Sequence, residues 1–117
     1  MTEPTRIFHN PRCSKSRQTL ELLTERGIEP EIIRYLETPP TEQQLEDILA
    51  ALNLSPRDLM RTGEKEYKEQ GLDDPGLSRE QLLAAMVATP KLIERPIVLA
   101  NGKAALGRPP ENVLSIL

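Results

Sequence analysis

The chain has 117 residues, of which 38% are hydrophobic and only 3% aromatic, and its formal net charge is −3. This length suits one domain that buries a core without disulfides, and the acidic balance argues against a general binder of nucleic acid or of anionic membranes. One cysteine and one histidine allow neither an internal disulfide nor a cysteine/histidine metal cluster, and no apolar stretch predicts a membrane span or a secretory signal, so the expected compartment is the cytosol.

The first third of the chain predicts a strand, a helix and a second strand. Residues 7–9 follow a strand pattern, residues 14–26 follow a helical pattern that Gly27 ends, and residues 32–35 are again apolar and β-branched. Connections this short between the three elements indicate a parallel, right-handed βαβ unit.

The middle of the chain predicts helices that begin at two capping boxes. Thr41 is followed three residues later by Gln44, and Ser78 is followed by Gln81 in the same way. An apolar stripe with helical spacing follows each pair, which indicates helices with one buried face. Between these two helices, residues 61–76 form a polar tract that we expect to be the part of the chain least involved in the core.

The last part predicts a hairpin and a final helix. Residues 96–100 and 103–106 are two apolar runs separated by Asn101-Gly102, the dipeptide that most strongly favours a two-residue β-hairpin. Pro109 and Pro110 then suit the first turn of a helix that ends the chain.

Together these elements predict an α/β fold of the thioredoxin-like type. The expected architecture is a four-stranded mixed sheet with helices on its faces and a helical insertion at about residues 41–90, all within a single domain of residues 1–117. No internal repeat or low-complexity segment suggests a second domain.

The only cysteine, Cys13, stands where the first strand gives way to the first helix. First-turn amides of a helix have no internal partners and the helix dipole adds positive potential, so a thiolate is favoured there over a thiol. We therefore interpret Cys13 as a reactive residue rather than an inert core cysteine. Its neighbours are candidates for binding a substrate or for tuning the ionisation of the thiol: His9, Asn10, Arg12, Ser14, Lys15, Ser16 and Arg17.

Three arginines are candidates for holding an oxyanion next to that sulfur: Arg61, Arg95 and Arg108. Arg95 and Arg108 lie just outside the two ends of the predicted hairpin, so an antiparallel pair returns both to one edge of the sheet. A planar guanidinium matches a tetrahedral oxyanion through paired hydrogen bonds, although any single arginine could instead form a surface ion pair. A Cys-x5-Arg anion loop is excluded, because Thr19 occupies the arginine position.

Several of these motifs together resemble the glutaredoxin-coupled arsenate reductase family, ArsC, which shares ancestry with the regulator Spx. The resemblance covers nearly the whole chain and rests on the following segments: His9-Asn10-Pro11-x-Cys13, Tyr35-Leu36-Glu37-Thr38-Pro39-Pro40-Thr41, Arg61, Arg95-Pro96-Ile97-Val98 and Arg108-Pro109.

The resemblance implies an enzyme of arsenic detoxification that reduces arsenate to arsenite. It makes Cys13 the nucleophile and makes Arg61, Arg95 and Arg108 the residues that hold arsenate and its reduced adduct. It places His9 near the thiol as a residue that favours its ionisation, while the residues alone fit a packed strand histidine equally well. It further implies glutathione as co-substrate, glutaredoxin as partner, no bound cofactor, and a cis-proline at Pro96.

Two other functions remain open. An Spx-like, non-catalytic regulator that binds RNA polymerase would use the same fold, but Ser16 stands where the redox-sensing members carry a second cysteine. A monothiol glutaredoxin-like oxidoreductase would act on glutathionylated substrates and would not need three arginines. The chain also departs from the best-known ArsC members at Gly107, where some carry a second cysteine. We expect a monomer, because no large apolar surface is evident.

Overall fold

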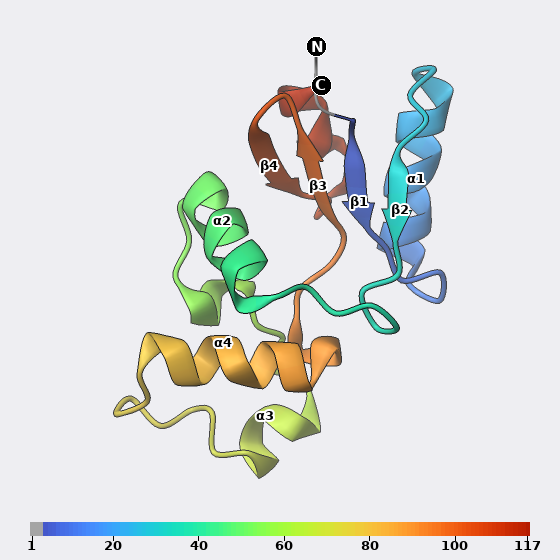
Figure 1. Cartoon of the computed structure of the whole chain (residues 1–117). Helices are drawn as coiled ribbons and strands as arrows, with labels where there is room; N and C mark the ends of the chain where they lie inside the picture. Colours follow the sequence, from blue (N-terminus) through green and yellow to red (C-terminus); the bar gives the residue numbers. More distant parts are fainter. Residues whose placement is uncertain (1–3) are drawn as a thin grey trace. The chain divides into compact units, whose positions relative to one another are not determined.

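The computed structural model describes residues 4–117; residues 1–3, which the expected domain of residues 1–117 includes, lie outside the described residues. The described chain forms two compact units, which are treated separately below (Figure 1). The sheet unit comprises residues 4–38 and 95–117, and the helical unit comprises Pro39–Glu94.

The sheet unit is built on four strands in the order β2-β1-β3-β4. Parallel pairing joins β1 to β2, and antiparallel pairing joins β1 to β3 and β3 to β4. The helix α1 (Ser14–Glu25) makes the crossover from β1 to β2, as the short connections predict. The four-stranded mixed sheet and the thioredoxin-like α/β fold are thus confirmed. The strands are β1 (Arg6–Phe8), β2 (Glu31–Ile33), β3 (Ile97–Ala100) and β4 (Lys103–Leu106).

The predicted hairpin forms between β3 and β4. Asn101 and Gly102 have φ values of 55° and 73°, so both occupy the left-handed region that a tight two-residue hairpin turn requires. Ile97 pairs with Leu106 at the other end of the hairpin, which brings the residues just outside these two strand ends together.

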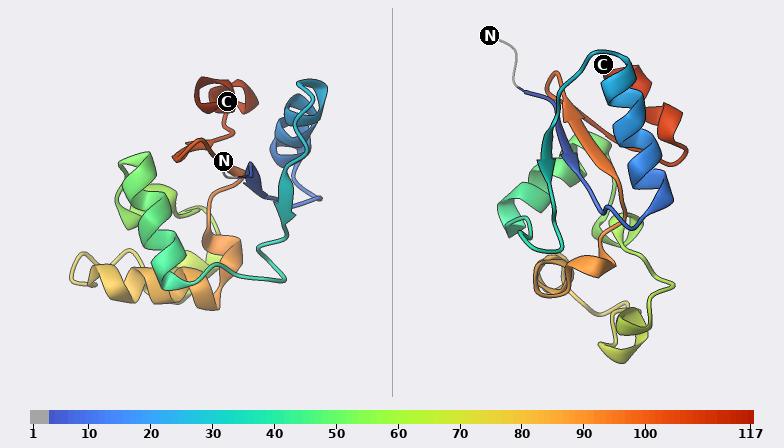
Figure 2. Two further views of the ribbon diagram at one scale, coloured as in Figure 1. Left: turned by 45° about the horizontal axis from the view of Figure 1, so that its top comes forward. Right: turned by 90° about the vertical axis from the view of Figure 1, so that its right-hand side faces the viewer.

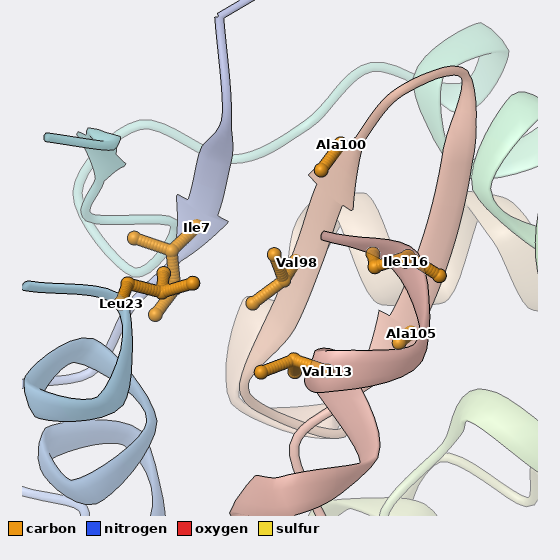
Figure 3. Close-up of a cluster of buried hydrophobic side chains, with 7 residues drawn as sticks. All are labelled: Ile7, Leu23, Val98, Ala100, Ala105, Val113 and Ile116. Atoms are coloured by element: carbon orange, nitrogen blue, oxygen red, sulfur yellow. The ribbon is translucent and has the colours of Figure 1, made fainter. Parts of the chain in front are cut away.

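The core of the sheet unit lies between one face of the sheet and two helical segments. Figure 3 shows Ile7 of β1 and Val98 of β3 pointing toward Leu23 of α1 and toward Val113 and Ile116 near the end of the chain. Three of these five side chains, those of Ile7, Leu23 and Val98, come from the first strand, the first helix and the hairpin. Burying them together therefore fixes the crossover helix against the sheet.

The last segment, η3 (Pro110–Ile116), is a 3₁₀ helix that packs beside α1 (Figure 2). The proline pair starts a helix as predicted, but the helix winds with three residues per turn. That winding aligns Val113 with Ile116, and both side chains are buried.

The helical unit contains α2 (Glu42–Leu52), η1 (Pro56–Leu59), α3 (Lys65–Glu69), α4 (Arg79–Ala88) and η2 (Pro90–Leu92). Both predicted capping boxes form. Thr41 Oγ1 accepts from the Gln44 amide at 3.1 Å, while the Gln44 side chain accepts from the Thr41 amide at 2.8 Å. Ser78 and Gln81 make the same exchange at 3.2 and 2.7 Å. No helix within residues 4–117 has the length and apolar character needed to cross a membrane.

The polar tract at residues 61–76 is more structured than its composition indicates. It contains α3, and it buries Tyr67 and Leu72, which are 8% and 5% exposed. A five-residue helix is too short to show a helical period in the sequence, so the pattern missed it.

Candidate active site

Cys13 is the N-cap residue of α1. Its backbone is extended, with φ −92° and ψ 123°, its amide donates to Asn10 O at 3.0 Å, and its carbonyl accepts from the Arg17 amide at 3.0 Å. The residue is 8% exposed. The predicted position at the start of the helix is confirmed, and it sets the residue beside the first-turn amides of α1.

Arg108 is the cationic residue whose side chain donates a hydrogen bond to this sulfur. Its Nη2 lies 3.9 Å from Cys13 Sγ, and its Nε donates to Arg95 O at 2.7 Å. The two arginines lie together because the hairpin pairs the strand ends next to them, as the sequence predicts. Just beyond the paired ends of β3 and β4, Gly107 N donates to Pro96 O at 2.9 Å. The peptide bonds Arg95-Pro96 and Arg108-Pro109 are both cis, the first as the resemblance implied.

A buried polar network supports the loop that carries Cys13. Ser16 Oγ lies 2.6 Å from His9 Nδ1 and accepts from the Asn10 amide at 3.0 Å. His9 is 6% exposed and Ser16 is fully buried. The Ser16 hydroxyl therefore ties the helix to the end of β1, and within residues 4–117 it makes no hydrogen bond to Cys13.

The surroundings of His9 disfavour its protonated form. Burial lowers the pKa of its imidazole, and the charges of Arg34 and Arg17 lower it further. One proton, carried either by His9 Nδ1 or by the Ser16 hydroxyl, lies in the 2.6 Å contact between the two groups. Through this contact His9, at the end of β1, holds Ser16 of α1.

The other candidate residues around Cys13 make hydrogen bonds to groups other than its sulfur, or are exposed. The Arg17 guanidinium donates to Pro11 O at 3.0 Å, and the Arg12 amide donates to Asn10 Oδ1 at 3.0 Å. In the described part of the chain, no hydrogen bond joins their cationic groups to Cys13 Sγ. The side chains of Ser14 and Arg12 are exposed, and that of Lys15 is half-buried.

Gly107 was not singled out as a site residue, but its backbone approaches α1 too closely for any side chain. A Cβ atom at this position would lie 2.7 Å from Pro96 Cγ and 3.1 Å from Thr19 Cγ2, and it would also overlap Thr19 Oγ1. Thr19 is fully buried, and its hydroxyl donates to Lys15 O at 2.8 Å. Gly107 thus sets the distance between α1 and the segment that carries Arg108.

Arg61 belongs to the helical unit, where carboxylates hold it. Its Nη1 lies 2.9 Å from Glu64 Oε1 and its Nε lies 3.7 Å from Glu94 Oε1. Its amide donates to Leu92 O at 2.6 Å, next to the bridge between Met60 and Ile93. A pocket of about 320 Å³ opens beside this arginine. Cys13, Arg95 and Arg108 therefore belong to the sheet unit, where Arg108 contacts Cys13 Sγ and the Arg95 carbonyl, whereas Arg61 belongs to the helical unit.

This arrangement suits nucleophilic attack on an oxyanion. A sulfur at a helix N-terminus with a guanidinium beside it can attack an electrophilic centre whose oxygens the guanidinium holds. Within residues 4–117, no group of three or more histidine, cysteine, aspartate or glutamate side chains is placed to hold a metal ion.

Comparison with known proteins decides the family. The model of the ArsC family matches residues 8–116, which is almost the whole chain. The chain belongs to the ArsC family.

Close relatives of this ArsC-family chain bear the name arsenate reductase. An arsenate reductase of Neisseria meningitidis serogroup A is 57% identical over 113 residues, covering 96% of this chain and 97% of the relative. The solved structure of an arsenate reductase from Vibrio cholerae superposes with a TM-score of 0.96 at 52% identity and covers both chains completely. A protein of Escherichia coli K12 called "Uncharacterized protein YfgD" is 58% identical over 118 residues, covering 100% of this chain and 99% of the relative.

Proposed function

We propose that this chain is an arsenate reductase that uses Cys13 as its nucleophile. The observation that carries the proposal is the placement of Cys13 Sγ at the N-cap of α1 with Arg108 Nη2 at 3.9 Å. The relatives named arsenate reductase, at 52–57% identity over nearly the full length, support the same substrate.

The first step joins the protein to arsenic. The Cys13 thiolate attacks the arsenic(V) atom of arsenate, a sulfur–arsenic bond forms, and one arsenate oxygen takes up a proton and leaves as water. Arg108 and Arg95 hold the remaining oxygens, whose negative charge their guanidinium groups balance throughout. No electrons have been transferred to arsenic at this stage.

The two electrons come from external thiols, because the chain has only one cysteine. The glutathione thiol attacks the adduct, displaces a second water and leaves arsenic(V) bonded to both sulfurs. A glutaredoxin thiolate then attacks the glutathione sulfur, forming a mixed disulfide. The electron pair of the broken sulfur–arsenic bond reduces arsenic to the +3 state. Hydrolysis of the remaining bond releases arsenite and restores the Cys13 thiol.

The other motif residues have supporting roles in this proposal. Arg61 joins Arg95 and Arg108 as an arsenate ligand, exchanging its bond to Glu64 for the oxyanion. His9 and Ser16 fix the loop, while Asn10, Arg12, Ser14, Lys15 and Arg17 form the rim that the anion enters. The reaction takes place in the cytosol in a monomeric protein, with glutathione and glutaredoxin as partners and without a bound cofactor.

The test is a coupled assay that follows NADPH consumption with arsenate, glutathione, glutaredoxin and glutathione reductase. We expect Cys13→Ser to abolish turnover and Arg108→Ala to lower kcat/KM for arsenate by about 10²-fold, as the loss of an oxyanion-stabilising donor does. Arg26→Ala is the matched control, since Arg26 is an exposed arginine at the other end of α1. Wild-type turnover in the Cys13→Ser variant would refute the mechanism.

The same assay separates the two other functions. A monothiol glutaredoxin-like enzyme would remove glutathione from a model mixed disulfide at a rate that Arg108→Ala leaves unchanged. A non-catalytic regulator would show no arsenate-dependent turnover in the wild-type protein.

A further inference from the structure

A second feature of the sheet unit lies beside the nucleophile loop. A pocket of about 340 Å³, here called the loop pocket, is lined by His9, Asn10, Pro11, Arg12, Arg34, Leu36 and Glu37. Its volume is that of a small-molecule site. The mechanism described above places no reacting atom in it.

The charges that line the loop pocket are of both signs. Arg12 and Arg34 supply two exposed guanidinium groups, and in the described part of the chain neither group takes part in a hydrogen bond or an ion pair. Glu37 supplies a carboxylate, and Leu36, whose side chain is 44% exposed, supplies an apolar surface. The lining therefore suits a small zwitterion that carries carboxylates and an ammonium group.

The loop pocket is also close enough to Cys13 to serve its chemistry. Arg12 immediately precedes Cys13, and the bond from His9 N to Ile33 O, at 2.8 Å, brings the segment that carries Arg34 alongside the loop. The charge of Arg34 reaches the His9 ring, which lies in the same lining.

Glutathione has a shape that matches this spacing. It is a tripeptide whose thiol is on the middle residue, so the glycine carboxylate lies roughly one residue length, about 3.5 Å of backbone, beyond the residue that carries the sulfur. On the other side the γ-linkage carries the carboxylate and the ammonium group of the glutamate two methylene groups further away. A glutathione sulfur approaching arsenic on Cys13 therefore carries a carboxylate into the neighbourhood of Arg12. The second guanidinium and Glu37 then face the other charged groups of the peptide.

We propose that the loop pocket is the glutathione site, with Arg12 and Arg34 binding its carboxylates and Glu37 binding its ammonium group. This inference rests on the proposed function, because it assigns a place to the thiol which that reaction consumes. Arg34 here is a binding residue for the co-substrate, and it does not touch arsenate.

Binding is tested without turnover by using S-methylglutathione, which cannot react. Titration followed by amide NMR should shift the signals of residues 34–37. Arg34→Ala should raise the dissociation constant about tenfold, as the loss of one charge-assisted hydrogen bond does. Arg26→Ala, which replaces an exposed arginine outside the loop pocket, should bind like the wild type. Wild-type affinity in Arg34→Ala, or shifts confined to residues outside the pocket, would overturn the proposal.

A second ligand identifies the group that Arg34 binds. The diethyl ester of S-methylglutathione has neither free carboxylate, so it should bind the wild-type protein about 10²-fold more weakly, and Arg34→Ala should weaken its binding no further. Equal losses for the acid and the ester would mean that Arg34 does not contact a carboxylate and would refute the assignment.

Kinetics separate the failure of this inference from the failure of the proposed function. If arsenate is reduced, Arg34→Ala should raise the KM for glutathione about tenfold and leave the KM for arsenate unchanged. An unchanged glutathione KM would sink the loop-pocket assignment and leave arsenate reduction standing. If the wild-type protein binds S-methylglutathione at residues 34–37 but does not reduce arsenate, the pocket stands and the substrate proposal fails.

Discussion

Replacing Gly107 by alanine tests how closely α1 must approach the segment that carries Arg108. The added Cβ would lie 2.7 Å from Pro96 Cγ and 3.1 Å from Thr19 Cγ2, well inside the 3.5–4.0 Å at which carbon atoms attract. Neither neighbour can yield cheaply. The side chain of Pro96 is a closed ring. Thr19 is a buried β-branched residue whose hydroxyl donates a hydrogen bond to the Lys15 carbonyl of the same helix.

The expected cost of Gly107→Ala is that of overpacking a rigid core, about 1–3 kcal/mol of unfolding free energy. For a chain of this size that lowers Tm by about 4 °C per kcal/mol. The strain would also displace Arg108 from Cys13, so we expect kcat/KM for arsenate to fall by up to about 10²-fold, as for a misplacement of about 1 Å. A cysteine at this position would bring the same Cβ into the same neighbours.

Urea unfolding of four proteins measures the effect: wild type, Gly107→Ala, Thr19→Ala and the double variant. Thr19→Ala removes two of the three overlapping atoms, so the double variant should be more stable than the sum of the single effects by about 0.5–1 kcal/mol. Gly63→Ala is the matched control, because a Cβ there meets nothing within 4 Å, and its effect should stay within about 0.5 kcal/mol. Additive effects, or an undiminished midpoint in Gly107→Ala, would refute the reasoning.

Three further predictions concern the stability of the fold. Ser78→Ala removes the cap that the Gln81 amide donates to and should cost about 1 kcal/mol in urea unfolding. Asn101→Ala places a side chain that disfavours φ 55° in the hairpin turn and also removes the bond to Ile116 O, so it should cost more than Asn101→Gly, which removes only the bond. Because burial lowers the pKa of His9, the unfolded chain binds a proton that the folded chain refuses. Stability should therefore fall as pH drops from 7.5 to 5.5, through the unfolded pKa of about 6.5, and the fall should be smaller in His9→Gln.

Each of these three predictions has an outcome that contradicts it. Ser78→Ala with an unchanged midpoint would mean that the capping box contributes nothing to α4. Equal losses in Asn101→Ala and Asn101→Gly would mean that the turn conformation imposes no cost on alanine. An identical pH slope in the wild type and His9→Gln would mean that His9 binds its proton equally well in both states.

Local sequence signals predicted those parts of the fold whose structure is decided locally. The dipeptide Asn101-Gly102 demands two left-handed residues, and it forms the predicted hairpin turn. Thr41 and Ser78 each cap a helix through a partner three residues away, so a four-residue sequence pattern predicts both helix starts. The pairing of β3 with β4 then brings Arg95 and Arg108 together, as the hairpin pattern in the sequence predicts.

Other features were missed because their causes lie elsewhere in the chain. The proline pair predicts that a helix starts at residue 110, but it does not distinguish an α-helix from a 3₁₀ helix. The 3₁₀ winding instead follows from the burial of Val113 and Ile116 against the sheet. Tyr67 is buried within a polar tract whose short helix shows no period. Ser16 is fully buried and bonded to His9 seven residues away, a pairing that no local pattern encodes.

The candidate site combines a local element with a non-local one, and this explains which variants should affect it. The strand–helix junction alone places Cys13 at a helix N-terminus, whereas Arg108 reaches the sulfur only through the hairpin and the close approach at Gly107. A change in the hairpin can therefore displace the guanidinium while the sulfur keeps its place. Comparing the alkylation of Cys13 with arsenate turnover in Gly107→Ala would separate the two: we expect Cys13 to remain reactive while turnover falls, and a parallel loss of both would show that the junction depends on the hairpin.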